Sequence, residues 1–152
     1  MRQASFLLLF LLIPLFIGCG PQTVAVTGHV TFLGEPGQDI SVLFEPITDA
    51  SITPPAAMGM TDANGFFRLR LADDTKKTGV MPGEYAVYFS WIDPAPDPNP
   101  EREGYVPKPE PYQIPDKARL GQVRFTVPES GPVVANFNFT EEDMQERIQQ
   151  GI

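Results

Sequence analysis

Residues 26–46 read VTGHVTFLGEPGQDISVLFEP, and this stretch decides the fold class. Over residues 24–32 the even-numbered positions are apolar or glycine, whereas the odd-numbered positions are small or polar. Over residues 40–45, Ile40, Val42 and Phe44 likewise share one face. A period of two predicts two β-strands, each with one buried face. The glycines and proline of residues 34–37 predict the turn between these strands.

Further segments with this alternation follow along the chain. Asn64-Gly65 predicts a tight hairpin turn, because this pair readily adopts positive φ. Arg68 and Arg70 share one face of the segment that returns from this turn. The remaining predicted strands are residues 57–61, 66–71, 84–92, 123–127 and 133–139. About seven short strands with turn signals between them are typical of an antiparallel β-sandwich.

Composition narrows the class of protein further. The chain has 152 residues, which predicts a single domain. Seventeen prolines and thirteen glycines argue against a helical bundle. A single cysteine excludes an internal disulfide framework and a cysteine-based zinc cluster. The net charge of -8 argues against nucleic acid as a partner.

Two segments differ from the strands. Residues 93–115 hold eight prolines in twenty-three positions, so we expect extended segments on the surface and no interior strand. A long loop of this kind in a compact domain is typically functional or disordered. The tail, residues 140–152, predicts a short helix in which Thr140 is the N-cap and Asp143 reciprocates.

The N-terminus predicts export. Residues 1–18 combine Arg2 with an apolar run that is too short to span a bilayer, which is typical of a signal peptide. Gly18-Cys19 then resembles the lipobox of bacterial lipoproteins, in which the cysteine thiol receives a lipid after cleavage. Phe16 departs from the Leu, Val or Ile of that pattern. An ordinary secretory peptide and an uncleaved anchor are the alternatives. Residues 19–23 would be a spacer.

Four stretches together resemble the carboxypeptidase regulatory-like domain, a transthyretin-like (prealbumin-like) sandwich. The likeness is greatest to the small lipoproteins with this domain that are abundant in planctomycete bacteria. Residues 26–46 resemble V-x-G-x-V-x-x-x-G-x-P and a strand that ends in proline. The others are GMTDANGFFRL (59–69), VMPGEYAVYF (80–89) and the stretch VPKPEPYQIPDKARLGQVRFTVPESGPVVANFNF (106–139). Two departures are Pro36 directly after Glu35, and Ala118 in place of a tyrosine.

The resemblance implies an all-β, seven-stranded antiparallel Greek-key β-sandwich over residues 24–139. It implies no catalytic residue, because this accessory domain carries none of the zinc ligands of carboxypeptidases. The residues agree, since neither a hydrolase nor a phosphate-loop motif occurs. His29 is the only histidine and falls on a predicted polar face. Asp62 begins a fragment of a calcium loop, but a hairpin turn explains it better. The sequence gives no reason to propose a metal or cofactor.

The expected function is therefore that of a non-enzymatic, lipid-anchored envelope protein, a structural or interaction module. Its lipid on Cys19 would hold it to a membrane, on the periplasmic side or at the cell surface, and its partner would be an envelope protein or a polysaccharide. The exposed sheet faces and the loop 93–115 are the expected contact surfaces. One alternative is a carbohydrate-binding module that stacks sugars on Trp91, Tyr105 or Tyr112. Another is an accessory subunit of a separate hydrolase.

Overall fold

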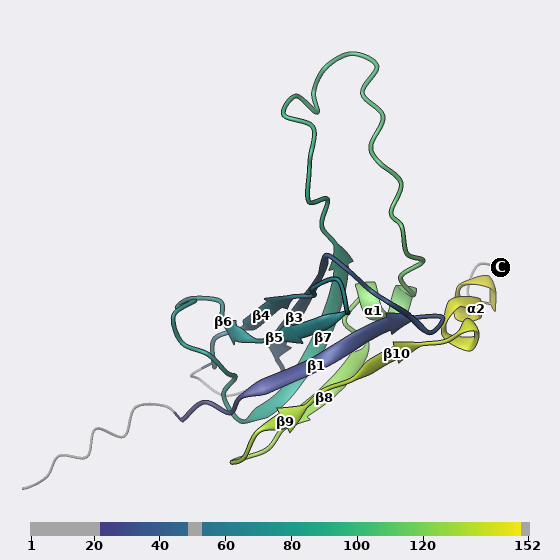
Figure 1. The fold of residues 1–152 in the computed structure, drawn as a ribbon. Helices are drawn as coiled ribbons and strands as arrows, with labels where there is room; N and C mark the ends of the chain where they lie inside the picture. The colour runs from purple at the N-terminus through teal and green to yellow at the C-terminus, as the bar shows by residue number, and fades with distance from the viewer. Residues whose placement is uncertain (1–21, 49–52, 150–152) are drawn as a thin grey trace, which may run out of the picture.

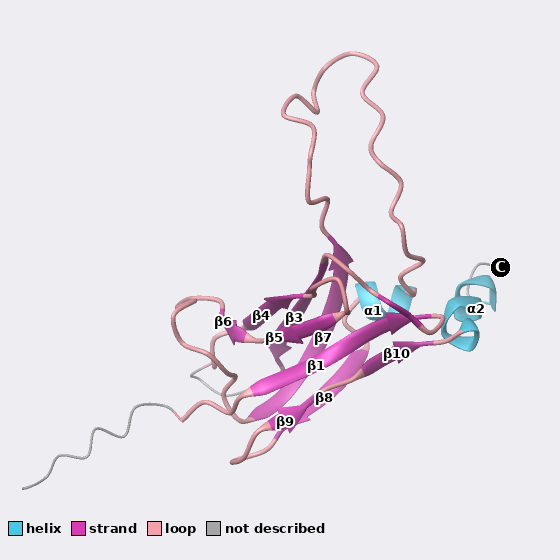
Figure 2. Ribbon diagram, viewed as in Figure 1, coloured by secondary structure: helices cyan, strands magenta, loops and turns pink. Residues whose placement is uncertain are grey.

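The computed structural model describes residues 22–48 and 53–149. The predicted signal peptide (1–18) and Cys19 lie outside the described residues. Within the described ranges the chain forms short strands and two short helices, α1 (Asp116–Arg119) and α2 (Glu141–Gln149) (Figure 2). The strands are β1 (Val26–Phe32), β2 (Glu35–Pro36), β3 (Ile40–Pro46), β4 (Ala57–Met60), β5 (Phe66–Arg68), β6 (Arg70–Leu71), β7 (Gly83–Trp91), β8 (Val123–Val127), β9 (Val133–Val134) and β10 (Phe137–Phe139).

These strands form two sheets that pack face to face, so the protein is an all-β sandwich (Figure 1). In the first sheet β1 is central: β2 and β5 pair with it antiparallel, and β9 and β10 pair with it in parallel. This sheet is therefore mixed, and the prediction of a purely antiparallel sandwich is wrong for the last strand segment, which runs in the same direction as β1. The second sheet has the order β6-β4-β3-β7-β8 and is antiparallel throughout. Its longest ladder joins β3 to β7, from Ile40 opposite Trp91 to Pro46 opposite Tyr85.

The structure divides two predicted strands and adds β2, so the described residues form ten strands where seven were expected. The segment 66–71 begins in the first sheet and ends in the second, and it crosses at buried Leu69, whose N–H donates to Val26 O at 3.0 Å. Strands that change sheets in this way form the corners of a sandwich. The segment 133–139 is interrupted at Asn136, whose side-chain Oδ1 accepts the His29 N–H at 3.0 Å.

The first predicted turn lies elsewhere. Residues 34–37 were expected to form it, but the two central residues are Leu33 and Gly34, with φ of 53° and 88°. Positive φ at both positions matches the right-handed twist of a two-residue hairpin. Glu35 and Pro36 consequently form β2, which pairs with Phe32 and Thr31. The sequence pattern missed this arrangement because leucine seldom adopts positive φ.

The core lies between the sheets and is rich in aromatic rings. Phe137 of β10 is its centre: its ring lies 4.9 Å from that of Phe89 and about 6 Å from three other rings, those of Phe44, Phe67 and Phe125. Rings at such separations in edge-to-face or stacked geometry add stabilisation beyond the burial of their area. The alternation read from the sequence is confirmed in β1, whose even-numbered residues are buried, and in β3, where Ile40, Val42 and Phe44 are buried.

The two helices close one side of the sandwich. The four-residue helix α1 was not predicted, because it is too short to show helical periodicity; it buries Ala118 and packs against β7. The expected C-terminal helix is α2. Asp143 accepts the backbone N–H of Thr140 at 2.7 Å, as the predicted capping arrangement requires. Asp143 also forms an ion pair with Lys117 of α1, which ties the two helices together.

Replacement of the central ring tests the role of the aromatic core. We expect Phe137→Ala to lower the free energy of unfolding by about 3–5 kcal/mol, because it removes buried area and leaves a cavity between the sheets. Chemical denaturation followed by circular dichroism measures the change. Val134→Ala is the matched control, since Val134 is 68% exposed in the same part of the chain. A loss below about 1 kcal/mol for Phe137→Ala would contradict this description.

Asp143 gives the attachment of α2 a pH dependence. Burial by itself would raise the pKa of Asp143, but the hydrogen bonds from Lys117 and Thr140 outweigh it and hold the pKa below its ordinary value. A carboxyl group with a lower pKa in the folded state stabilises the fold above its unfolded pKa, about 3.9, and this contribution is lost as the pH falls through the folded pKa.

We therefore expect Asp143→Asn to be less stable than the wild type at pH 7, and the difference to shrink as the pH falls below about 4. Urea titrations at several pH values measure it. Glu129→Gln, in the exposed turn after β8, is the control and should follow the wild type at every pH. A difference for Asp143→Asn that is independent of pH would show that the ion pair does not stabilise α2.

Candidate interaction surface

The most prominent surface feature is an arm, which we define as residues 93–111. It rises out of the sandwich between β7 and α1 and extends away from both sheets (Figure 1). None of its residues is in a strand or helix. Proline is frequent in it, and proline both fixes φ and removes a backbone donor. The arm therefore has an extended backbone that cannot fold back into a regular ladder.

Both limbs of the arm are fastened at their base to the same turn. Beside the outgoing limb, the Ile92 N–H donates to Asp39 O at 2.9 Å. Beside the returning limb, Tyr112 Oη accepts the Gln38 N–H at 2.8 Å. The Tyr112 ring also stacks on Phe32, with 5.2 Å between the ring centroids. The base is thus fixed to the core although the rest of the arm is exposed.

Ion pairs hold the two limbs together above this base. Lys108 Nζ donates to Asp93 Oδ1 at 3.0 Å and to Ala95 O at 2.7 Å. The pKa of Asp93 is lowered, mainly because its carboxylate accepts the Ala95 N–H. Partial burial opposes this shift, and the hydrogen bond and charge of Lys108 add to it. Arg102 pairs with Asp97 at 2.8 Å. Exposed pairs of this kind add little stability, but here they define how the limbs lie.

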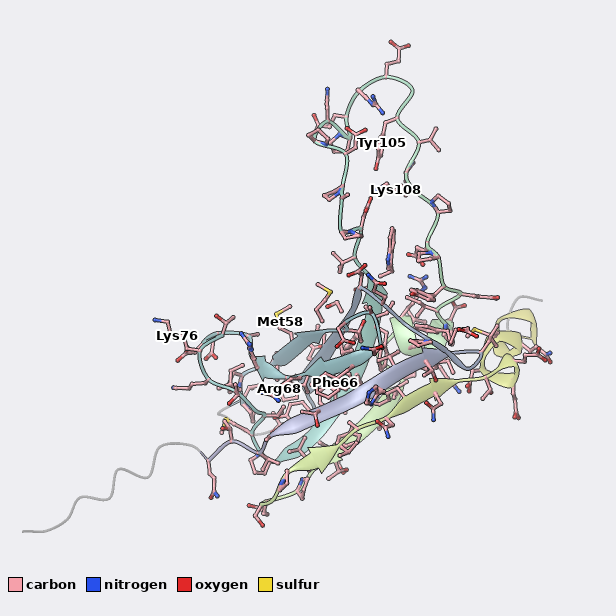
Figure 3. The ribbon with its side chains drawn as sticks, viewed as in Figure 1. Met58, Phe66, Arg68, Lys76, Tyr105 and Lys108 are labelled. Carbon is pink, nitrogen blue, oxygen red and sulfur yellow. The ribbon has the colours of Figure 1, made fainter. Side chains whose placement is uncertain are left out.

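The aromatic residues expected to contact a ligand do not form one platform. Trp91 and Tyr112 are half-buried and pack against the core at the base of the arm. Tyr105 lies on the arm near Lys108, away from both sheets (Figure 3). It borders a hollow of about 380 Å³ between the limbs, together with Arg102 and Val106. The structure therefore separates Tyr105 from the other two rings.

The arm and the N-terminal entry lie at opposite ends of β1. At the entry, Val24 exchanges two backbone hydrogen bonds with Val80, of 2.7 and 2.8 Å. At the other end of β1, Phe32 stacks on Tyr112 at the base of the arm. Seven strand residues separate these ends, roughly 23 Å at the usual rise per residue. Residues 22–25, which enter β1, and the arm therefore lie at different ends of the sandwich (Figure 1).

A second surface lies on the outer side of β4, beside β5 and β6. We call it the methionine groove; its hollow is about 420 Å³, and its lining residues are Met58, Gly59, Met60, Asp62, Phe66, Arg68 and Arg70. Met58 and Met60 are 42% and 50% exposed. A Cβ at Gly59 would lie 2.6 Å from Arg68 O, so the floor of the groove requires the absence of a side chain there.

The sequence contained only part of the signal for this groove. It placed Arg68 and Arg70 on one face, and the structure shows both exposed there (Figure 3 labels Arg68). The methionines were not singled out. Met58 lies directly opposite Arg70 in the ladder between β4 and β6. The pairing register between segments decides that contact, and single-strand alternation does not reveal it.

The residues considered for catalysis or metal binding have other partners. His29 is exposed and lies edge-on against Phe66, with 5.3 Å between ring centroids. Asp62 Oδ1 accepts the N–H groups of Asn64 and Phe66 at 2.8 and 3.0 Å, which is the geometry of a side-chain-stabilised hairpin turn. Among the residues that the structure describes, no three His, Cys, Asp or Glu side chains are grouped as metal ligands.

Of the helices in the described ranges, neither is long and apolar enough to cross a bilayer.

Comparison with known proteins identifies no family. No family model and no curated protein matches the sequence. A similar solved structure is a DUF3823 family protein from Parabacteroides merdae, with 16% sequence identity and a TM-score of 0.39. The match covers 80% of this chain and 47% of that one, so the chain spans about half the length of that protein. The sandwich architecture rests on the two sheets of the chain itself.

The base of the arm gives a direct prediction. Tyr112→Phe keeps the ring on Phe32 but removes the acceptor of the Gln38 N–H, so we expect a loss of about 1 kcal/mol in stability and faster hydrogen exchange at the Gln38 amide. Tyr105→Phe is the control, because the Tyr105 hydroxyl has no hydrogen bond within the described residues. Unchanged exchange at Gln38 in Tyr112→Phe would mean that this hydrogen bond does not fix the arm.

Proposed function

We propose that this chain is a non-enzymatic lipoprotein of the bacterial cell envelope, whose sandwich holds a contact arm away from the membrane. The observation that carries the proposal is the position of the arm at the end of β1 opposite the N-terminal entry. A lipid on Cys19 would leave five residues before Val24, a reach of at most about 17 Å. The entry end of the sandwich would then face the lipid, and the arm would face outward.

The sandwich fits this role as a rigid support. A contact segment is most effective when it is positioned by a scaffold whose own residues are packed. The base of the arm meets this condition, because Tyr112 and Trp91 pack against the core. The exposed part carries charged and polar groups together with Val106, which is 80% exposed. Such a composition suits recognition of another macromolecule better than binding of a small molecule in an enclosed pocket.

The proposal extends to the family. We infer that the chain is one of the lipoproteins with a carboxypeptidase regulatory-like, transthyretin-like domain, and that its seven strand segments form the Greek key of that fold. The last strand segment returns to lie beside β1, as a late strand does in a Greek key, although it pairs with β1 in parallel and so departs from the purely antiparallel motif. No catalytic role follows, because that domain is an accessory of the enzymes that contain it.

Two changes to the full chain test the proposal in the native envelope. Cys19→Ala is expected to leave the membrane fraction, because the lipid is the anchor. Replacement of residues 94–110 by a short Gly-Ser linker is expected to keep the chain in the membrane but to abolish its crosslinks to a partner. Fractionation and crosslinking with mass spectrometry measure both. A change of Glu129 and Ser130 in the turn after β8 to alanine is the control for the arm.

Each result has a distinct meaning. Membrane retention of the Cys19→Ala chain would contradict the lipid anchor. Partner crosslinks that survive replacement of the arm would contradict its role as the contact element. Enrichment of glycan in place of a protein partner would favour carbohydrate binding and direct attention to Trp91 and the tyrosines.

A further inference from the structure

We propose that the methionine groove receives the arm of a second copy of this protein. The inference rests on the proposed role of the arm as a contact element and does not depend on the lipid anchor. It follows from the chemistry of two surfaces, the groove and the distal part of the arm.

The groove contains two cationic groups that have no acidic partner among the residues the structure describes. Most other lysine and arginine side chains that the structure describes are engaged. Ion pairs hold Lys77, Arg102, Lys108, Lys117 and Arg119, and Arg124 donates to the carbonyl of Gly121. In contrast, the side chains of Arg68 and Arg70 make no hydrogen bond or ion pair with any described residue. They are exposed side by side in a protein with a net charge of -8.

The apolar part of the groove lies directly beside these two arginines. Met58 faces Arg70 across the ladder, and Phe66 lies on the same face of β5 as Arg68. Exposed methionine side chains adapt their shape to a partner and are frequent at such surfaces. Asp62 is the one acidic residue of the lining, so the two arginines leave the groove with a net positive charge. The groove is therefore suited to an occupant that is acidic and partly apolar.

The distal arm has these properties. Glu101 and Glu103 are exposed and have no hydrogen-bond or ion-pair partner among the described residues, whereas other arm carboxylates are paired. Val106 follows three residues after Glu103 and is 80% exposed. The unpaired carboxylates and the free apolar side chain of the arm thus complement the unpaired guanidinium groups and methionines of the groove.

The two surfaces of one molecule do not meet. The part of the arm that holds Tyr105 lies far from Met58 and Arg68, and the arm projects away from the sandwich (Figure 3). The contact therefore requires two molecules. Because donor and acceptor are different surfaces, two arrangements are possible. Two molecules can exchange arms reciprocally in a two-fold symmetric dimer, or successive molecules can form a head-to-tail chain. Complementary charges favour encounter and register, and salt weakens them.

Crosslinking between two tagged full-length chains in the native envelope tests the inference. One chain carries V106C and the other M58C, and a bismaleimide joins thiols that lie close together. The wild-type chain, whose one cysteine is Cys19, gives the background level of crosslinking. We expect a V106C–M58C adduct well above this background, and its yield to fall as sodium chloride rises. T126C, at an exposed position of β8, is used in place of M58C as the matched control and should give no adduct.

Charge exchange identifies the interacting groups. Adding R68E and R70E to the M58C chain should lower the adduct yield by about tenfold, and E101R with E103R in the V106C chain should restore it. R68K with R70K should retain most of the yield. All the substituted side chains are exposed, so we expect each variant to keep the sandwich intact. Thermal melting of each variant checks this.

Absence of the V106C–M58C adduct, or failure of the reversed charges to restore it, would overturn the inference. An adduct of M58C with a different envelope protein would also overturn it, because the groove would then have another occupant. A partner crosslink that is lost on arm replacement, without self-crosslinking, would leave the proposed function standing and remove only this inference.

Discussion

Phe137 packs between the two sheets and joins them at the centre of the core. Its ring comes from β10, at the end of the sandwich sequence, and meets Phe89, Phe44 and Phe125 of the second sheet. Without that cluster the two sheets would lose the apolar contact that favours their association. The cluster also fixes the position of β10 along β1. The parallel pairing of the first and last strands is therefore held by side-chain packing as well as by backbone hydrogen bonds.

A close approach at Gly28 makes this arrangement possible. A Cβ at that position would lie only 1.8 Å from the carbonyl oxygen of Ala135, so no side chain fits there. The backbone on either side of the β9–β10 interruption is thereby allowed close to β1. At the interruption the His29 N–H has no ladder carbonyl to bond, and it donates to the Asn136 side chain instead. Buried and partly buried backbone groups need such partners, and a side-chain acceptor replaces the missing ladder carbonyl.

The core also holds the arm and the methionine groove in place. The arm has no ladder of its own, yet its base is fixed by Tyr112 on Phe32 and by hydrogen bonds at Gln38 and Asp39. The methionine groove depends on the crossing of residues 66–71 from one sheet to the other. Both candidate contact surfaces thus arise where the sandwich begins or ends a regular strand. Such positions leave polar groups and side chains available without weakening the buried layer.

Local sequence patterns were sufficient to predict the fold class, the positions of most strands and the C-terminal helix. Alternation along β1, β3 and β7, and the turn at Asn64-Gly65, are local signals that the burial of one face makes strong. Only the packing of the folded chain shows that two predicted strands are divided, that the turn lies at Leu33-Gly34, and which segments pack against each sheet face. These depend on register and contacts between distant segments. The proline-rich segment was recognised from composition, but its fixation by Tyr112 was not, because Tyr112 and Gln38 lie far apart in sequence. The groove likewise required knowledge of which residue of β4 faces Arg70.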